Sequence, residues 1–189
     1  LKAMKDAGAQ AIYYGGSTHG GGCAIRAEMS GVFPAGRAAP FLGGDGIAED
    51  PACVSAAGAD EAGIFATVPI VDADIRPSAA ATVRAFKSTF GGITDYGPYT
   101  VIAYDATAVL YAAIDQAIRA AGGSAPDREA VTAQVAETSQ LAGASGSLGF
   151  DAAGDTTNRV LSIFETPGSD PRASWKIVDA VDYSAHLPY

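Results

Sequence analysis

The chain has 189 residues, of which 48% are apolar and 17% are charged, a composition typical of a folded, water-soluble protein with a substantial core. Its formal net charge is −9, and its Lys and Arg residues form no cluster. Nucleic acid and anionic membrane surfaces are therefore excluded as expected partners, because their affinity depends on a basic surface. No uncharged apolar run reaches the roughly 20 residues that a membrane span requires.

The first 69 residues alternate helix and strand signals. The opening residues predict the end of a helix that stops at Gly8, so we expect the chain to be a fragment of a longer protein. Asp50 followed by Pro51 is typical of a helix N-terminus. The further predicted elements, in chain order, are a strand at 11–14, a helix at 23–29, a strand at 40–42, a helix at 52–57 and a strand at 63–68.

Such alternation implies βαβ units and hence a parallel sheet, on which ligands bind at the carboxyl ends of the strands. Two glycine-rich loops follow predicted strands, at 15–19 and at 43–46. In the second loop, Asp45 stands between glycines that let a carboxylate approach a cationic ligand, although an ordinary turn aspartate fits the pattern as well. The first loop offers the polar residues Ser17, Thr18 and His19.

The remainder of the chain predicts helices followed by strands. The Gly/Ser-rich stretch 143–149 has the composition of a linker, and 150–155 that of a turn. The two closing strands can pair across 166–173. The predicted regular elements, in chain order, are helices at 77–90, 99–121 and 128–137 and strands at 159–165 and 174–181.

An alternative interpretation is an α/β hydrolase. The segment His19–Gly22 matches the oxyanion-hole loop of some lipases and esterases. The required nucleophile elbow is incomplete, however, because the segment around Ser145 has Ser147 in place of the final glycine. His186 follows in the right order for a base, but near the chain end.

Metal and nucleotide sites lack their patterns. The two histidines have no Cys, Asp or Glu cluster at ligand spacing, and Gly20–Gly22 lacks the lysine and hydroxyl of a phosphate-binding loop. No metal and no cofactor are expected. The two cysteines, Cys23 and Cys53, fit either a disulfide or two buried thiols.

Five segments in a fixed order resemble the C-terminal half of a substrate-binding protein of the branched-chain amino acid ABC transporter type. Together they span nearly the whole chain. They are Ala11–Gly16, Pro40–Gly46, Gly63–Pro69, Gly97–Ala106 (with Gly97-Pro98-Tyr99 before Ala103-Tyr104-Asp105-Ala106) and Gly149–Asp155.

This resemblance implies an α/β protein with a type I periplasmic-binding-protein fold, a three-layer α/β/α architecture built on a parallel sheet. The fragment would cover most of lobe 2 and the C-terminal part of lobe 1. Residues 1–69 would belong to lobe 2, 70–157 to lobe 1, and 158–189 would return to lobe 2.

The resemblance also assigns candidate ligand-binding residues. In the family an acidic residue of the second loop pairs with the α-ammonium of the ligand, and the matching position is Asp45, preceded by Gly44, where the family typically has Glu. Ser17, followed by Thr18, stands where the family has an aromatic contact, a departure that leaves the ligand's side chain undefined. Tyr99 matches the aromatic residue that lines the side-chain pocket.

The implied function is a non-enzymatic, extracytoplasmic receptor that captures an amino acid or similar small polar ligand between two lobes and delivers it to an ABC permease. The precursor would carry a signal peptide, and the receptor would lie in the periplasm or at the cell surface, where a lipid anchor is one form of attachment. The missing N-terminal half would complete the cleft. Export favours a disulfide between Cys23 and Cys53. A ligand-sensing domain of a regulator with the same fold is a further alternative.

Overall fold

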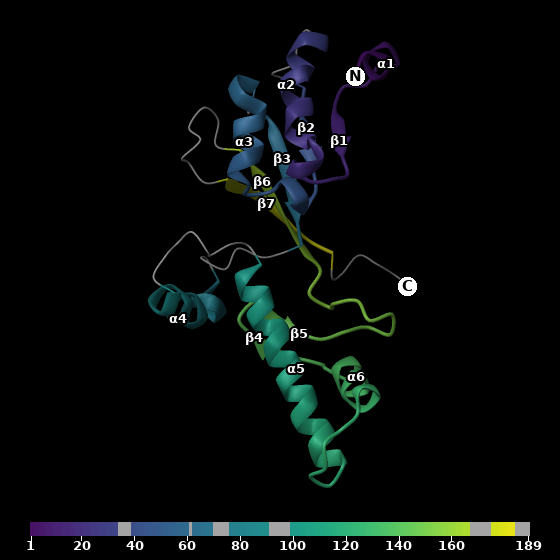
Figure 1. The fold of residues 1–189 in the computed structure, drawn as a ribbon, viewed down its shortest axis with the longest axis vertical. Helices are drawn as coiled ribbons and strands as arrows, with labels where there is room; N and C mark the ends of the chain where they lie inside the picture. The colour runs from purple at the N-terminus through teal and green to yellow at the C-terminus, as the bar shows by residue number, and fades with distance from the viewer. Residues whose placement is uncertain (34–38, 61, 70–75, 91–98, 167–174, 184–189) are drawn as a thin grey trace. The chain divides into compact units, whose positions relative to one another are not determined.

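The structure, a computed structural model, describes residues 1–33, 39–60, 62–69, 76–90, 99–166 and 175–183. Its chain forms two compact units (Figure 1). Unit 1 comprises Leu1–Pro69 with Leu161–Val181, and unit 2 comprises Ile70–Val160 with Asp182–Tyr189. The assignment of these units to the two lobes of a complete receptor stays a prediction.

Unit 1 is built on a five-stranded sheet with the order β1-β2-β3-β6-β7. The first three strands are parallel to one another, as the alternation of helices and strands predicts, whereas β6 runs antiparallel to β3. The sheet is therefore mixed and mostly parallel. The strands are β1 Ile12–Tyr14, β2 Phe41–Gly43, β3 Ile64–Val68, β6 Val160–Glu165 and β7 Lys176–Asp182.

The described residues of the same unit also form three helices and three short 3-10 turns. The Asp50 carboxylate accepts the backbone N–H of Ala52 and so caps α3, with Pro51 in the first helical turn, as the sequence predicts. The helices are α1 Lys2–Asp6, α2 Gly22–Val32 and α3 Pro51–Ala57, and the turns are η1 Thr18–Gly20, η2 Asp45–Ile47 and η3 Gly58–Asp60.

The core of unit 1 joins the sheet to these helices. Five of its large apolar side chains are fully buried, namely Met29, Phe41, Ile47, Ile64 and Val68. They come from α2, β2, η2 and β3, so the turn that begins with Asp45 is anchored in the core through Ile47. Burial of a side chain of this size contributes about 1.5 to 3 kcal/mol.

Unit 2 contains helices and a β-hairpin. The prediction of a linker at 143–149 is wrong, because the segment forms this hairpin around a two-residue turn, Ala144-Ser145. Both turn residues are buried, and a carboxylate distant in sequence, that of Asp105, binds their N–H groups. The elements are η4 Pro77–Ala79, α4 Ala80–Phe90, α5 Thr100–Ala120, α6 Arg128–Ala136, β4 Leu141–Gly143 and β5 Gly146–Leu148.

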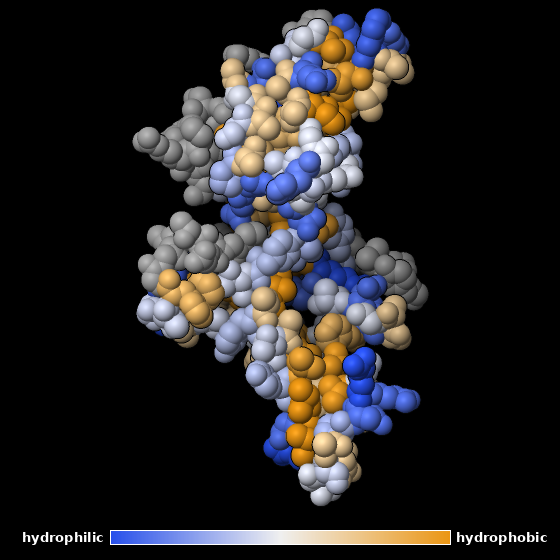
Figure 2. Space-filling view, in the orientation of Figure 1, coloured by the Kyte–Doolittle hydropathy of each residue, from blue (hydrophilic) through white to orange (hydrophobic). Residues whose placement is uncertain are grey.

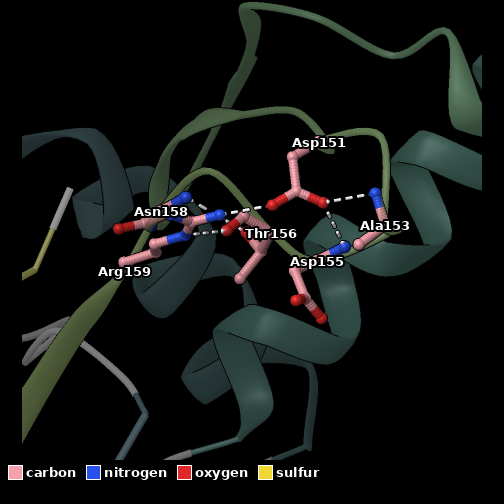
Figure 3. Close-up of polar contacts among 6 residues, drawn as sticks. All are labelled: Asp151, Ala153, Asp155, Thr156, Asn158 and Arg159. Carbon is pink, nitrogen blue, oxygen red and sulfur yellow. Dashed lines mark hydrogen bonds and ion pairs between the residues drawn. The ribbon is translucent and has the colours of Figure 1, made fainter. Parts of the chain in front are cut away.

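A carboxylate loop follows the hairpin (Figure 3). The Asp151 carboxylate accepts the backbone N–H groups of Ala153 and Asp155 at 2.9 and 3.0 Å and forms an ion pair with Arg159. These contacts lower the pKa of Asp151, chiefly through the N–H of Asp155. Desolvation acts in the opposite direction, and the N–H of Ala153 and the Arg159 guanidinium lower the pKa further. The turn predicted at 150–155 is thus held by hydrogen bonds to the Asp151 carboxylate.

Helix α5 is apolar on two faces. One face is buried and carries Val101, Val109, Ala113 and Ala117 in addition to Asp105. The other face exposes Tyr104, Leu110 and Tyr111, and Figure 2 shows apolar residues gathered along α5. By length and composition alone, α5 would also fit a membrane span, which the sequence analysis did not predict. Its buried Asp105 and its packing against α6 are those of a helix inside a folded unit.

Candidate ligand-binding site

The first glycine loop leaves β1 at the carboxyl edge of the parallel strands. Gly15 and Gly16 lead into the turn η1, and Gly21 adopts φ 84°, a left-handed conformation that favours glycine. Ser17 and His19 are exposed. The hydroxyl oxygen of Thr18 is buried and has no hydrogen-bond partner in the described part of the chain. The loop therefore presents backbone groups and the Ser17 side chain at this edge of the sheet, whereas the Thr18 hydroxyl points inward.

The second glycine loop leaves β2 at the same edge. Tyr14 and Gly43 are register partners, so the two parallel strands end side by side. Asp45 is exposed and begins the turn η2, in which the N–H of Ala48 donates to the Asp45 carbonyl at 3.1 Å. The buried side chain of Ile47 fixes this turn against the sheet. The Asp45 carboxylate therefore stands on an anchored support at a strand's carboxyl end.

The two loops are in direct contact through Gly46. A Cβ atom at Gly46 would lie only 2.6 Å from the carbonyl oxygen of Gly16 and 3.1 Å from the Cα of Ser17. Only glycine permits this approach, because atoms at such distances would overlap. The structure thus brings together four of the five predicted ligand-binding residues, Ser17, Thr18, Gly44 and Asp45, within unit 1.

Tyr99, the fifth predicted residue, belongs to unit 2. It precedes α5 at the N-cap position and is 40% exposed. The residues Gly97 and Pro98, which carry the resemblance at this point, lie outside the described residues. Its role in a ligand pocket stays a prediction.

The chemistry of the paired loops suits a small polar ligand that carries a cationic group. The Asp45 carboxylate is exposed on the second loop, beside a first loop that carries backbone groups and the exposed Ser17, and a carboxylate favours an ammonium or a similar cation. Among the residues that the structure describes, no group of three His, Cys, Asp or Glu side chains could hold a metal ion.

The constellation required for a hydrolase is not formed by the described residues. Ser145 lies in the turn of the β4-β5 hairpin, not between a strand and a helix, and its hydroxyl donates to the Asp105 carboxylate. Gly20 and Gly22 pack against Tyr14, which accounts for these two glycines without an oxyanion hole. His186 lies outside the described residues.

A disulfide and a buried arginine fix helix α2, which follows the first loop. A disulfide joins Cys23 of α2 to Cys53 of α3, and both residues are fully buried. One turn after Cys23, the fully buried Arg26 donates to the carbonyl oxygens of Asp60, Ala39 and Ala62 at 2.8, 3.0 and 2.6 Å.

The sequence analysis did not single out Arg26, nor Tyr14 beyond its place in a strand. Burial lowers the pKa of Arg26, while Asp60 acts in the opposite direction. A signal existed for each residue. Arg26 is the single basic residue of its helix, and Tyr14 precedes glycines at 16, 20 and 22.

Comparison with known proteins identifies the fold. No family model matches the chain. The leucine-binding protein LivK of Thermotoga maritima superposes with a TM-score of 0.71 at 23% identity, over 95% of this chain and 46% of that one. LivJ of Streptococcus pneumoniae, solved with isoleucine, gives a TM-score of 0.64 at 19% identity, over 95% of this chain and 47% of that one. A solute-binding protein of Rhodopseudomonas palustris HaA2, solved with p-hydroxybenzoic acid, gives a TM-score of 0.66 at 15% identity, over 95% of this chain and 47% of that one. The chain therefore has a type I periplasmic-binding-protein fold.

A relative with higher sequence identity connects the chain to amino-acid-binding proteins. The leucine-, isoleucine-, valine-, threonine- and alanine-binding protein of Pseudomonas aeruginosa is 30% identical over 168 residues, which cover 87% of this chain and 40% of that protein. The chain thus spans less than half the length of these relatives. The resemblance to the C-terminal half of a branched-chain amino acid ABC transporter substrate-binding protein is confirmed.

Proposed function

We propose that this chain is part of an extracytoplasmic receptor that captures an amino acid, or a compound with a similar ammonium group, and delivers it to an ABC permease. The observation that carries the proposal is the contact of the two glycine loops at one edge of the sheet, with the Asp45 carboxylate exposed on an anchored turn. The amino acids named for the Pseudomonas aeruginosa and Streptococcus pneumoniae relatives support this ligand class.

The Asp45 carboxylate supports one of the two ligand classes named for the neighbours. An amino acid carries an ammonium that pairs with it, whereas p-hydroxybenzoic acid, bound by one neighbour, carries no cation. The Asp45 carboxylate would repel the carboxylate group of an aromatic acid placed against it. Asp45 therefore favours an amino acid over an aromatic acid.

Capture without catalysis is the activity that fits these groups. Binding needs only a fixed charge, backbone dipoles and the exclusion of water, and each charge-assisted contact contributes about 1.5 to 3 kcal/mol. The Ser145 hydroxyl, the candidate nucleophile of the hydrolase alternative, is bound to Asp105.

The disulfide between Cys23 and Cys53 supports an oxidising, extracytoplasmic location. A ligand-sensing domain would use the same capture chemistry, but LivJ of Streptococcus pneumoniae is the substrate-binding protein of a branched-chain amino acid transporter, which favours a transporter receptor.

The remaining half of the receptor is the partner that we assign to the second apolar face of α5. This face exposes Tyr104, Leu110 and Tyr111, and beside it α4 and α5 border a groove of about 800 Å³ lined by Phe86 and Phe90 among others. A helix that is apolar on both faces is typically covered on both. More than half the length of the relatives lies beyond the matched region, and we propose that the corresponding part of this receptor packs here.

A thermal-shift screen of the complete receptor against amino acids tests the proposal. We expect an amino acid to raise the melting temperature, and we expect Asp45→Ala to abolish the rise. Asp6→Ala is the matched control, because Asp6 is an exposed carboxylate of the same unit whose ion pair with Lys2 lies at the surface. An unchanged response of Asp45→Ala would remove this residue from its assigned role. Labelling of Ser145 by an active-site serine probe would support the hydrolase instead.

A further inference from the structure

The ring of Tyr14 fills the space beneath the first glycine loop. A Cβ atom at Gly16 would lie 2.6 Å from the ring carbon Cζ, one at Gly20 would lie 2.7 Å from the hydroxyl oxygen, and one at Gly22 would lie 2.4 Å from Cε1. Cβ atoms do not approach other atoms this closely. The three glycines and the tyrosine ring are therefore mutually dependent: the loop can wrap the ring only because it lacks side chains at these positions.

The ring is held from two directions. It stacks on Phe41 with a centroid distance of 6.2 Å and an interplanar angle of 23°, and Phe41 is fully buried in the core of unit 1. The Tyr14 hydroxyl donates to the carbonyl oxygen of Gly20 at 3.1 Å and lies 3.5 Å from that of Ser17. Tyr14 thus connects the core to both ends of the segment that contains Ser17 and Thr18.

The backbone positioned in this way also receives the second loop. Gly46 packs against the carbonyl of Gly16 and the Cα of Ser17, and a Cβ atom at Gly43 would lie 3.5 Å from the backbone carbonyl oxygen of Tyr14. A displacement of the first loop would consequently change the surface on which the turn of Asp45 rests. The order of contacts runs from Phe41 to Tyr14, to the first loop and then to Asp45.

We propose that Tyr14 is a positioning residue for ligand capture, which sets the first glycine loop and, through the contact with Gly46, the Asp45 carboxylate. This inference rests on the proposed function of Asp45. Tyr14 itself acts from beneath the loop through its ring and hydroxyl, and its contribution to affinity comes from holding the two loops at one spacing.

The test compares Tyr14→Phe with Tyr13→Phe in the complete receptor. Both variants remove one hydroxyl beside the loops, but the Tyr13 side chain is 65% exposed, and its hydroxyl, 3.9 Å from a Cβ atom built at Gly44, makes no hydrogen bond in the described part of the chain. The first readout is the affinity for leucine by isothermal titration calorimetry. The second is amide hydrogen exchange in residues 15–20 and 44–48, measured without ligand, and the melting temperature reports global stability.

We expect Tyr14→Phe to weaken leucine binding about threefold to tenfold and to accelerate exchange in both loops, with a nearly unchanged melting temperature. Tyr13→Phe should match the unsubstituted receptor in each readout. Gly46→Ala, which forces the loops apart without altering Tyr14, should weaken binding in the same direction.

Equal affinity and equal exchange in Tyr14→Phe and Tyr13→Phe would overturn the role of Tyr14. The proposal also fails if exchange accelerates in the first loop alone, because the coupling to Asp45 would then be absent. If the unsubstituted receptor binds no leucine, the proposed ligand class fails separately, and hydrogen exchange in the two loops still decides whether Tyr14 positions them.

Discussion

The carboxylate of Asp105, on the buried face of α5, accepts both the backbone N–H and the hydroxyl of Ser145. The same carboxylate also accepts the N–H of Ala144 at 2.8 Å, so one side chain binds the whole turn of the β4-β5 hairpin. The partners are 39 and 40 residues apart in sequence. This contact fixes the hairpin to the long helix of unit 2.

Substitution Asp105→Asn should destabilise unit 2 by about 2 to 4 kcal/mol, because an amide would place N–H donors against N–H donors in a buried site. Urea denaturation followed by far-ultraviolet circular dichroism measures this loss, since α4, α5 and α6 of unit 2 hold most of the α-helical residues that the structure describes. The matched control is Asp115→Asn on the same helix, whose carboxylate forms an exposed ion pair with Arg119. The control should change stability by less than about 0.5 kcal/mol, and equal losses in the two variants would refute the assigned role.

The hairpin illustrates what the sequence could and could not reveal. Local signals sufficed where one residue and its neighbours determine the structure, as in the Asp50 cap and the glycine loops at 15–19 and 43–46. The Gly/Ser-rich composition at 143–149 suggested a linker because the partner that orders it, Asp105, is distant in the chain. Non-local contacts of this kind have no signature in local composition.

The candidate site divides in the same way. The pairing of the Ser17 and Asp45 loops follows from parallel strands that end at one edge, and it could be predicted. The glycines at 16, 20 and 22 hinted at a bulky neighbour of the first loop, but that this neighbour is the Tyr14 ring could not be predicted, because it depends on the direction in which the ring points. The assignment of Tyr99 to the pocket stays a prediction that rests on resemblance alone.

Arg26 should be essential for the stability of unit 1. Arg26→Met would remove hydrogen bonds to three backbone carbonyls from a fully buried position, with an expected loss of about 2 to 4 kcal/mol. Urea denaturation followed by the fluorescence of Trp175 reports on this unit, since the chain has a single tryptophan and it is buried there. Lys5→Met, at an exposed cation of α1, is the control. A variant as stable as the control would show that these hydrogen bonds are dispensable.

Asp151 should make the stability of its loop depend on pH. Its pKa is lower in the folded chain than its ordinary value, so the unfolded state binds the proton more readily. The stabilisation is therefore complete above the ordinary carboxyl range, near neutral pH, and disappears as the pH falls through that range and then below the folded pKa. Asp151→Asn should remove this part of the acid dependence.

Thermal unfolding of both forms between pH 7 and pH 3 measures the difference. The gap between the original chain and Asp151→Asn should narrow as the pH falls. Asp155→Asn is the control, because Asp155 contributes its backbone N–H to the network rather than its carboxylate (Figure 3). A gap that is constant with pH would exclude the ionised Asp151 as its cause.

The exposed apolar face of α5 should cause this 189-residue chain to self-associate when it is prepared alone, because large exposed apolar patches are normally covered. Leu110→Glu combined with Tyr111→Glu should shift the distribution toward monomer. Sedimentation velocity across a concentration series measures this shift, and Gln116→Glu, which adds charge at an exposed α5 position outside Tyr104, Leu110 and Tyr111, serves as the control. Association that survives the double substitution would place the contact elsewhere.

The most direct test of the receptor interpretation is calorimetric titration of the complete receptor with leucine and with 4-methylpentanoate, which has the same carbon skeleton without the ammonium group. The interpretation predicts that leucine binds more tightly, on the order of 10- to 100-fold, and that Asp45→Asn removes this preference. Equal affinity for the two compounds, or a preference for leucine that persists in Asp45→Asn, would contradict it.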